Sequence, residues 1–149
     1  MSRPLLLLLS ACLLVGCGAR PSPANPLAGV RTLTLASVSG VSASELSPGL
    51  GLDLESALRR SLAVRGYQIR DTEGGEASVR ASWFQEARLL PDGRREVHLG
   101  ISLSIFDRSG ERVFSARSAR TTPAGQWNGD RVAAEVSHLL RSLPESGAP

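Results

Sequence analysis

The stretch that decides the fold is residues 95–107, REVHLGISLSIFD. Apolar side chains alternate here, without a break, with polar or small ones, and the apolar set is Val97, Leu99, Ile101, Leu103 and Ile105. Alternate side chains of a β-strand point to opposite faces. We therefore predict a strand with one face in the core and the other face outside it.

Turn signals and further strand patterns flank this stretch on both sides. PDG at 91–93 and DRSGER at 107–112 predict tight turns, because proline presets φ and glycine tolerates a positive φ. Residues 77–90 place Val79, Ala81 and Trp83 on one face, and residues 112–120 read as the return strand. The pattern does not decide to which side of the sheet Phe114 points. The three strands are expected to form an antiparallel meander.

Two amphipathic helices and a first strand complete the pattern. Residues 30–38 predict the first strand, and leucines then recur every four residues at Leu50, Leu54, Leu58 and Leu62. Residues 130–143 carry a second apolar stripe, with Asn128 or Asp130 near its N-cap. The order β-α-β-β-β-α predicts a two-layer α+β sandwich, in which a mostly antiparallel four-stranded sheet carries two helices on one face. Its strand–helix–strand start allows a parallel crossover.

The amino terminus has the pattern of a lipoprotein signal peptide. Arg3 precedes an apolar run over residues 5–15, which is too short to span a bilayer. Leu14, Val15, Gly16 and Cys17 then resemble the bacterial lipoprotein box, whose cysteine is lipidated. We expect a signal peptide at 1–16, a lipid anchor and linker at 17–28, the α+β domain at 29–144 and a disordered tail at 145–149. An ordinary signal peptide is the alternative.

Composition narrows the class of function. The chain has two cysteines, one of them inside the signal peptide, so the mature chain is expected to hold no disulfide and no thiolate metal site. Arginine supplies every basic side chain except histidine, but the charges are mixed along the chain, so no nucleic-acid stripe emerges. His98 and His138 have no metal-ligand spacing, and no pair of carboxylates is placed for acid–base catalysis. We expect no metal, no cofactor and no enzyme activity.

The face of the sheet that points away from the helices is the candidate site. Arginine, aromatic and small hydroxyl side chains mix there, which suits contact with a protein partner or an anionic amphiphile. The alternative is an ordinary solvent-exposed face that carries a few apolar residues. The candidate contact residues are Arg80, Phe84, Arg88, His98, Phe106 and Arg117.

The chain also resembles a known family. The segments GCG at 16–18, VRTLTLASVSG at 30–40 and VHLGISLSIFDRSGERVFSARS at 97–118 carry the resemblance, together with the helix pattern LxxALRRxL. They look like the lipopolysaccharide-assembly lipoprotein family, and other small envelope lipoprotein families share the pattern. The chain departs from that family at Ala19, where an aromatic residue is frequent, and in its short loop at 89–95.

The resemblance implies a non-enzymatic subunit that is anchored by palmitate and other acyl chains in the outer membrane and faces the periplasm. Its implied partners are an outer-membrane β-barrel, in which it sits as a plug, and lipopolysaccharide. Arg80, Arg88 and Arg117 suit phosphate contact because guanidinium pairs bidentately with phosphate. The alternative function is a stand-alone binding or scaffolding lipoprotein that is accessory to a transporter or a peptidoglycan synthase.

Overall fold

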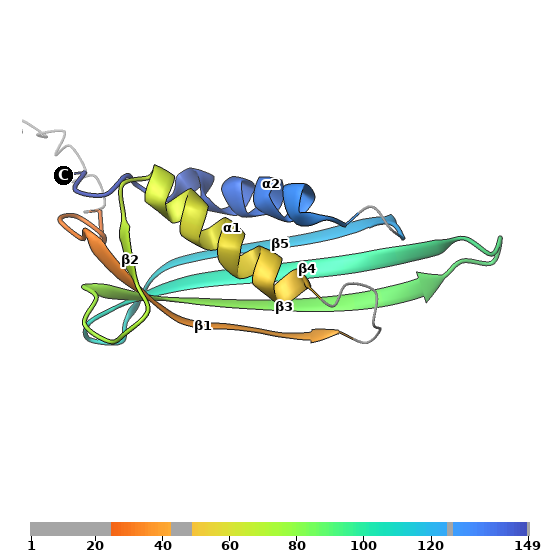
Figure 1. Ribbon diagram of the computed structural model, residues 1–149, viewed down its shortest axis with the longest axis horizontal. Helices are drawn as coiled ribbons and strands as arrows, with labels where there is room; N and C mark the ends of the chain where they lie inside the picture. The colour runs from red at the N-terminus through yellow and green to blue at the C-terminus, as the bar shows by residue number, and fades with distance from the viewer. Residues whose placement is uncertain (1–24, 43–48, 125–126, 149) are drawn as a thin grey trace, which may run out of the picture.

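The computed structural model describes residues 25–42, 49–124 and 127–148. Within these residues two α-helices lie on one face of a single five-stranded sheet, so the α+β class and the two layers are confirmed (Figure 1). The elements in chain order are β1 (Thr32–Ser42), α1 (Leu50–Val64), β2 (Gln68–Arg70), β3 (Ala77–Leu89), β4 (Arg95–Asp107), β5 (Arg112–Pro123), α2 (Gly129–Leu139) and the 3₁₀ helix η1 (Leu140–Ser142).

The strand order in the sheet is β2-β1-β3-β4-β5. β1 pairs in parallel with both β2 and β3, whereas β3, β4 and β5 form the predicted antiparallel meander. The sheet is therefore mixed and has five strands, where we expected four mostly antiparallel strands. The additional strand, β2, spans three residues directly after α1, and this is too short for an alternating pattern to show in the sequence.

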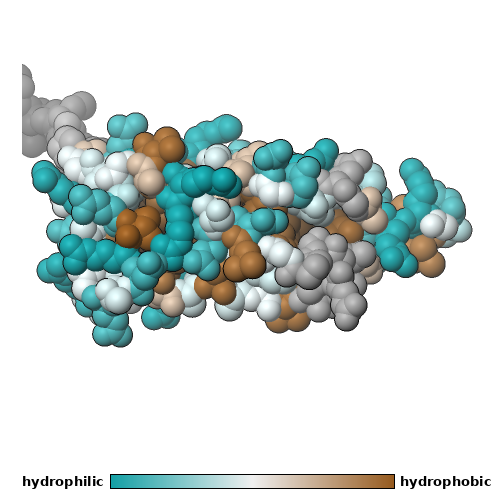
Figure 2. Space-filling model, in the orientation of Figure 1, coloured by the Kyte–Doolittle hydropathy of each residue, from teal (hydrophilic) through white to brown (hydrophobic). Residues whose placement is uncertain are grey.

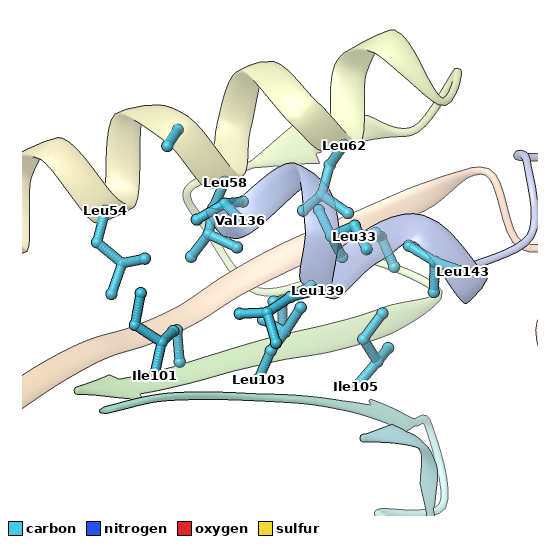
Figure 3. Packing of buried hydrophobic residues seen from close by; sticks show 14 of the residues in the cluster. Leu33, Leu54, Leu58, Leu62, Ile101, Leu103, Ile105, Val136, Leu139 and Leu143 are labelled. Atoms are coloured by element: carbon cyan, nitrogen blue, oxygen red, sulfur yellow. The ribbon is translucent and has the colours of Figure 1, made fainter. Parts of the chain in front are cut away.

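The core lies between the sheet and the two helices. Leu54, Leu58 and Leu62 of α1 point toward the sheet, as do Val136 and Leu139 of α2 (Figure 3). All five apolar residues of the alternating β4 stretch are buried, and Leu99, Ile101, Leu103 and Ile105 share one core cluster with the helix residues. The predicted apolar stripes of both helices and the predicted core face of β4 are therefore confirmed.

The helix ends follow the local chemistry of the sequence. Gly66 ends α1 with a φ of +86°, a conformation that costs glycine little because it has no Cβ. Asn128 caps α2, since its side-chain oxygen accepts a 3.0 Å hydrogen bond from the backbone N–H of Arg131. Tyr67, which follows α1, is buried and donates its hydroxyl proton to the carbonyl oxygen of Pro144.

Both ends of the described chain pack against the domain. Leu27 falls within the stretch that we expected to be linker, yet its side chain is buried in the core. The expected tail also makes contacts, because Ser146 donates its backbone N–H to the carbonyl oxygen of Arg65 and its hydroxyl proton to that of Val30. The first described residues and the carboxyl terminus therefore lie at the same end of the molecule (Figure 1).

The β3–β4 hairpin extends toward the opposite end. Its tip projects beyond the body of the molecule and has a mostly hydrophilic surface (Figure 2). The PDG turn closes it as predicted, with the backbone N–H of Leu90 bonded to the carbonyl oxygen of Arg94. In the DRSGER turn, Asp107 accepts hydrogen bonds from Ser109 and Glu111, and these bonds hold the pKa of its carboxyl below the usual range.

Candidate functional site

The six candidate contact residues all lie on the side of the sheet that faces away from α1 and α2, which we call the outer face. Side chains opposite each other on paired strands share a face. Arg80 of β3 is opposite Ser104 of β4. Ser82 of β3 is opposite Ser102 of β4, which is in turn opposite Arg117 of β5. The same register aligns Phe84 with Gly100, Arg88 with Glu96, Glu86 with His98 and Ser78 with Phe106.

Phe84 lies flat on this face. A Cβ built on Gly100 would fall 2.0 Å from the Cε1 atom of Phe84, so the ring occupies the space that any side chain at 100 would fill. The ring of His98 is tilted against it, with 5.4 Å between the ring centroids. Although Phe84 is 47 % exposed, it covers the backbone of β4 rather than projecting into solvent.

Arg80 is held along the same face, nearer the end at which β1 begins. Its guanidinium carbon lies 4.8 Å from the centroid of the Phe106 ring, which is a cation–π contact. Stacking leaves the edge of a guanidinium group and its N–H donors available for a further partner. Arg80 therefore presents a positioned cation and not a freely rotating one.

Serine fills the centre of the outer face. One row runs across the sheet from Ser39 through Ser82 and Ser102 to Arg117, and the neighbouring row contains Ser37, Ser104 and Ser115. Serine side chains are short, so they project little from the sheet. Each offers one hydrogen-bond donor and two acceptor lone pairs. The centre of the face is thus flat and able to form hydrogen bonds.

A pocket of about 310 Å³ lies on this face near the hairpin end. Its lining residues are Glu86, Arg88, Glu96, His98 and Thr121. His98 is fixed by a 2.9 Å contact between its Nδ1 atom and the hydroxyl of Thr121. Glu86 and Glu96 were not among the predicted contact residues, although the same alternation that selected Arg88 and His98 places both of them on the outer face.

The structure settles the facing of two apolar residues. Phe114 is opposite Ile105 and packs against the core, so it lies on the helix side and does not join the candidate residues. Val41 is opposite Phe84 and is 71 % exposed, so the outer face has an apolar row that the sequence analysis missed. The register between β4 and β5 shifts at Ile105/Phe106, because β5 has one additional residue, Val113, and this irregularity breaks the alternation next to Phe114.

The described residues offer no cluster of three or more histidine, cysteine, aspartate or glutamate side chains placed to hold a metal ion. The same residues include no helix that is both long and apolar enough to cross a membrane. Cys17, the predicted lipidation site, lies outside the residues that the structure describes. The side chains of the outer face offer hydrogen bonding, cation–π contact and ion pairing.

Comparison with known proteins relates the chain to solved structures only. No protein-family model matches it, and no curated protein matches it. Lipoprotein GNA1162 from Neisseria meningitidis superposes with a TM-score of 0.57 at 9 % identity, over 76 % of this chain and 97 % of that one. A PelC variant from Paraburkholderia phytofirmans, solved as a dodecamer, superposes with a TM-score of 0.53 at 22 % identity, over 76 % and 86 %.

A hypothetical protein from Chlamydia trachomatis, CT253, shows the same level of similarity. Its TM-score is 0.52 at 10 % identity, over 76 % of this chain and 93 % of that chain. At these identities the likeness establishes the fold. The fold is therefore one that a small bacterial lipoprotein uses, which agrees with the coarser part of the family resemblance and leaves the lipopolysaccharide-assembly family itself unconfirmed.

Proposed function

We propose that this protein is a lipid-anchored, non-enzymatic assembly subunit of the bacterial outer membrane, and that its outer face docks the partner it serves. The lipid is attached at Cys17, and the domain faces the periplasm. The observation that carries the proposal is the build of the outer face. α1 and α2 cover the opposite side of the sheet, while Phe84, Arg80 and the serine rows present a flat surface.

Flatness favours a large partner over a small substrate. Small-molecule sites are usually concave and bury most of their ligand, whereas protein interfaces bury about 800 Å² on each partner. Aromatic and arginine side chains are also the residue types enriched at the centre of such interfaces. Phe84 and Arg80 are both present here and already positioned.

The partners we propose are an outer-membrane β-barrel protein and lipopolysaccharide. The family resemblance suggests both, and the arginines of the outer face suit lipid A phosphates. Arg80 and Arg117 lie on neighbouring rows of the serine-lined centre, so one phosphorylated headgroup or one acidic loop of a barrel can meet both.

Affinity purification tests this proposal. The tagged, lipidated protein is extracted from outer membranes in mild detergent, and the proteins that co-purify are identified by mass spectrometry. We expect a β-barrel protein in roughly stoichiometric amount. The variant Arg80→Ala/Arg117→Ala should lose most of it, because both cations leave the face and the domain keeps its core.

The matched control is Arg60→Ala/Arg131→Ala, which removes the same charge from the helix layer. It should retain the barrel protein. Recovery of the lipoprotein alone, under conditions that preserve known barrel complexes, would contradict the proposal and favour the stand-alone scaffolding lipoprotein. Equal loss in both double variants would show that net charge, and not the outer face, governs the association.

A further inference from the structure

Two edges of the sheet are left without a partner strand in the described part of the chain. β2 pairs only with Thr32–Thr34 of β1, so the remainder of β1 has no neighbour on that side. β5 pairs with β4 and is the last strand of the sheet. Each edge presents backbone N–H and C=O groups that a further strand can bond.

The free stretch of the β1 edge carries neither charge nor proline. Natural proteins blunt free edges with charged side chains, proline or a bulge. β1 has a bulge between Leu35 and Ser37, but the stretch 37–42, SVSGVS, contains neither a charge nor a proline. β5 by contrast carries Arg117 and Arg120, which are exposed. An uncharged edge without proline is a template on which a strand of another chain can pair.

The free stretch of β1 and the middle of β5 lie at the same height along the strand axis. Following the cross-strand partners, Ser39 is level with Arg117, and Val41 is level with Ala119. A second copy placed beside the first therefore brings its β5 against this β1 with no slide along the strand axis. Arg117 and Arg120 of one edge then meet Ser39 and Ser42 of the other, and the pairing ends before Thr34, where β2 already occupies the edge.

Strand direction adds a second argument. β1 runs parallel to β3, and β5 runs antiparallel to β4, so β1 and β5 point the same way. Copies joined β1 to β5 keep their amino-terminal ends together. This part rests on the lipid anchor proposed above, since all anchors must reach one membrane. Pairing of β1 with β1 of another copy would be antiparallel and would send the anchors to opposite ends.

We propose that residues 37–42 of β1 bind the β5 edge of a second copy, in parallel register with Ser39 opposite Arg117, so that copies associate head to tail. A contact of this kind uses different surfaces on each copy, and it gives a closed ring when the rotation closes. It leaves the outer face of every copy open to a partner.

Disulfide cross-linking in intact envelopes tests the register. Neighbouring strands lie about 4.8 Å apart, which is within the range of Cα separations that a disulfide spans. The full-length variant Ser39→Cys/Arg117→Cys should, on oxidation, form a ladder of covalent oligomers. The control variant Ser39→Cys/Arg112→Cys should not, because Arg112 is opposite Phe106, four residues and about 14 Å further along β4 than Ser102, the partner of Arg117.

Each other outcome overturns the proposal. A dimer from Ser39→Cys alone would show pairing of β1 with β1. Cross-linking that is equal in both double variants would show random collision. A monomeric band from a variant that keeps the melting temperature of the unsubstituted protein would show that the edge is free. Partner capture is measured without these cysteines, so failure of the self-association and failure of the proposed function are distinguishable.

Discussion

The ring of Phe84 lies over Gly100 of the neighbouring strand, and a Cβ at 100 would meet its Cε1 atom at 2.0 Å. The pairing keeps the outer face flat at the position where β3 carries its aromatic residue. Glycine lowers the stability of a strand, so its presence here needs a reason, and the ring that covers it is that reason.

Gly100→Ala should lift the Phe84 ring from the sheet and cost about 1 kcal/mol, the size of a lost cross-strand aromatic contact. In a Phe84→Ala background the same substitution should be neutral or stabilising, because alanine restricts the unfolded chain more than glycine does. Urea unfolding of the four variants measures the coupling. Purely additive free energies would contradict the contact.

The helix layer depends on leucines that face the sheet. Leu58 of α1 is 1 % exposed and packs in the core between the helix and the sheet. Leu58→Ala should therefore reduce the free energy of unfolding by about 2–5 kcal/mol. Leu52 lies on the same helix but is 75 % exposed, and Leu52→Ala should change stability by less than about 0.5 kcal/mol. Chemical denaturation of both variants checks the difference. Equal effects would mean that the helix does not pack as described.

A carboxylate links the start of β1 to the start of β3. Glu76 accepts hydrogen bonds from the backbone N–H groups of Arg31 and Thr32, which lower the pKa of its side chain from 4.5. A lowered pKa in the folded state adds stability above the unfolded-state value, and that stability is lost as the pH falls through the folded-state value.

Glu76→Gln should therefore lower the melting temperature at pH 7, and the difference from the unsubstituted protein should shrink below about pH 4.5. Thermal unfolding of both proteins across pH 3–7 measures it, using buffers of matched ionic strength. Glu73→Gln, in the same loop, is the control for loss of charge. A melting-temperature difference that stays constant across the pH range would exclude the proposed role of the carboxylate.

The anchor is tested by the variant Cys17→Ser. Acyl chains contribute about 0.8 kcal/mol for each buried CH₂ group, so their loss should release the protein from membranes into the soluble fraction. The melting temperature of the domain should not change, because the buried core of the described residues begins at Leu27, ten residues after Cys17. Fractionation after a salt wash gives the result. Retention on the membrane would mean that a partner holds the protein or that no lipid is attached.

Strong periodicity in the sequence predicted most of the fold. The five alternating residues of β4 and the leucine series of α1 identified the core correctly, because each pattern extends over several repeats. Short or irregular features escaped. β2 has only three residues, and the bulge near Ala36 and the register shift near Phe106 break the two-residue period.

The candidate site was likewise predicted only in part from the sequence. Alternation placed Arg80, Phe84 and His98 on the outer face, because every second side chain of a strand points to the same side of the sheet. It did not reveal that Phe84 lies on Gly100, or that Val41 continues the row onto β1. Those relationships depend on the register between paired strands, and the alternation within one strand gives no information about that register.

Photo-crosslinking from the outer face tests the central claim most directly. A photoreactive amino acid replaces Ser82, which is exposed at the centre of the outer face, or Ser137, which is exposed on α2, in the otherwise unsubstituted lipoprotein in living cells. Our account predicts a specific adduct with another envelope protein or with lipopolysaccharide from position 82 and none from position 137. Adducts from position 137 alone, or from neither position, would contradict docking through the outer face.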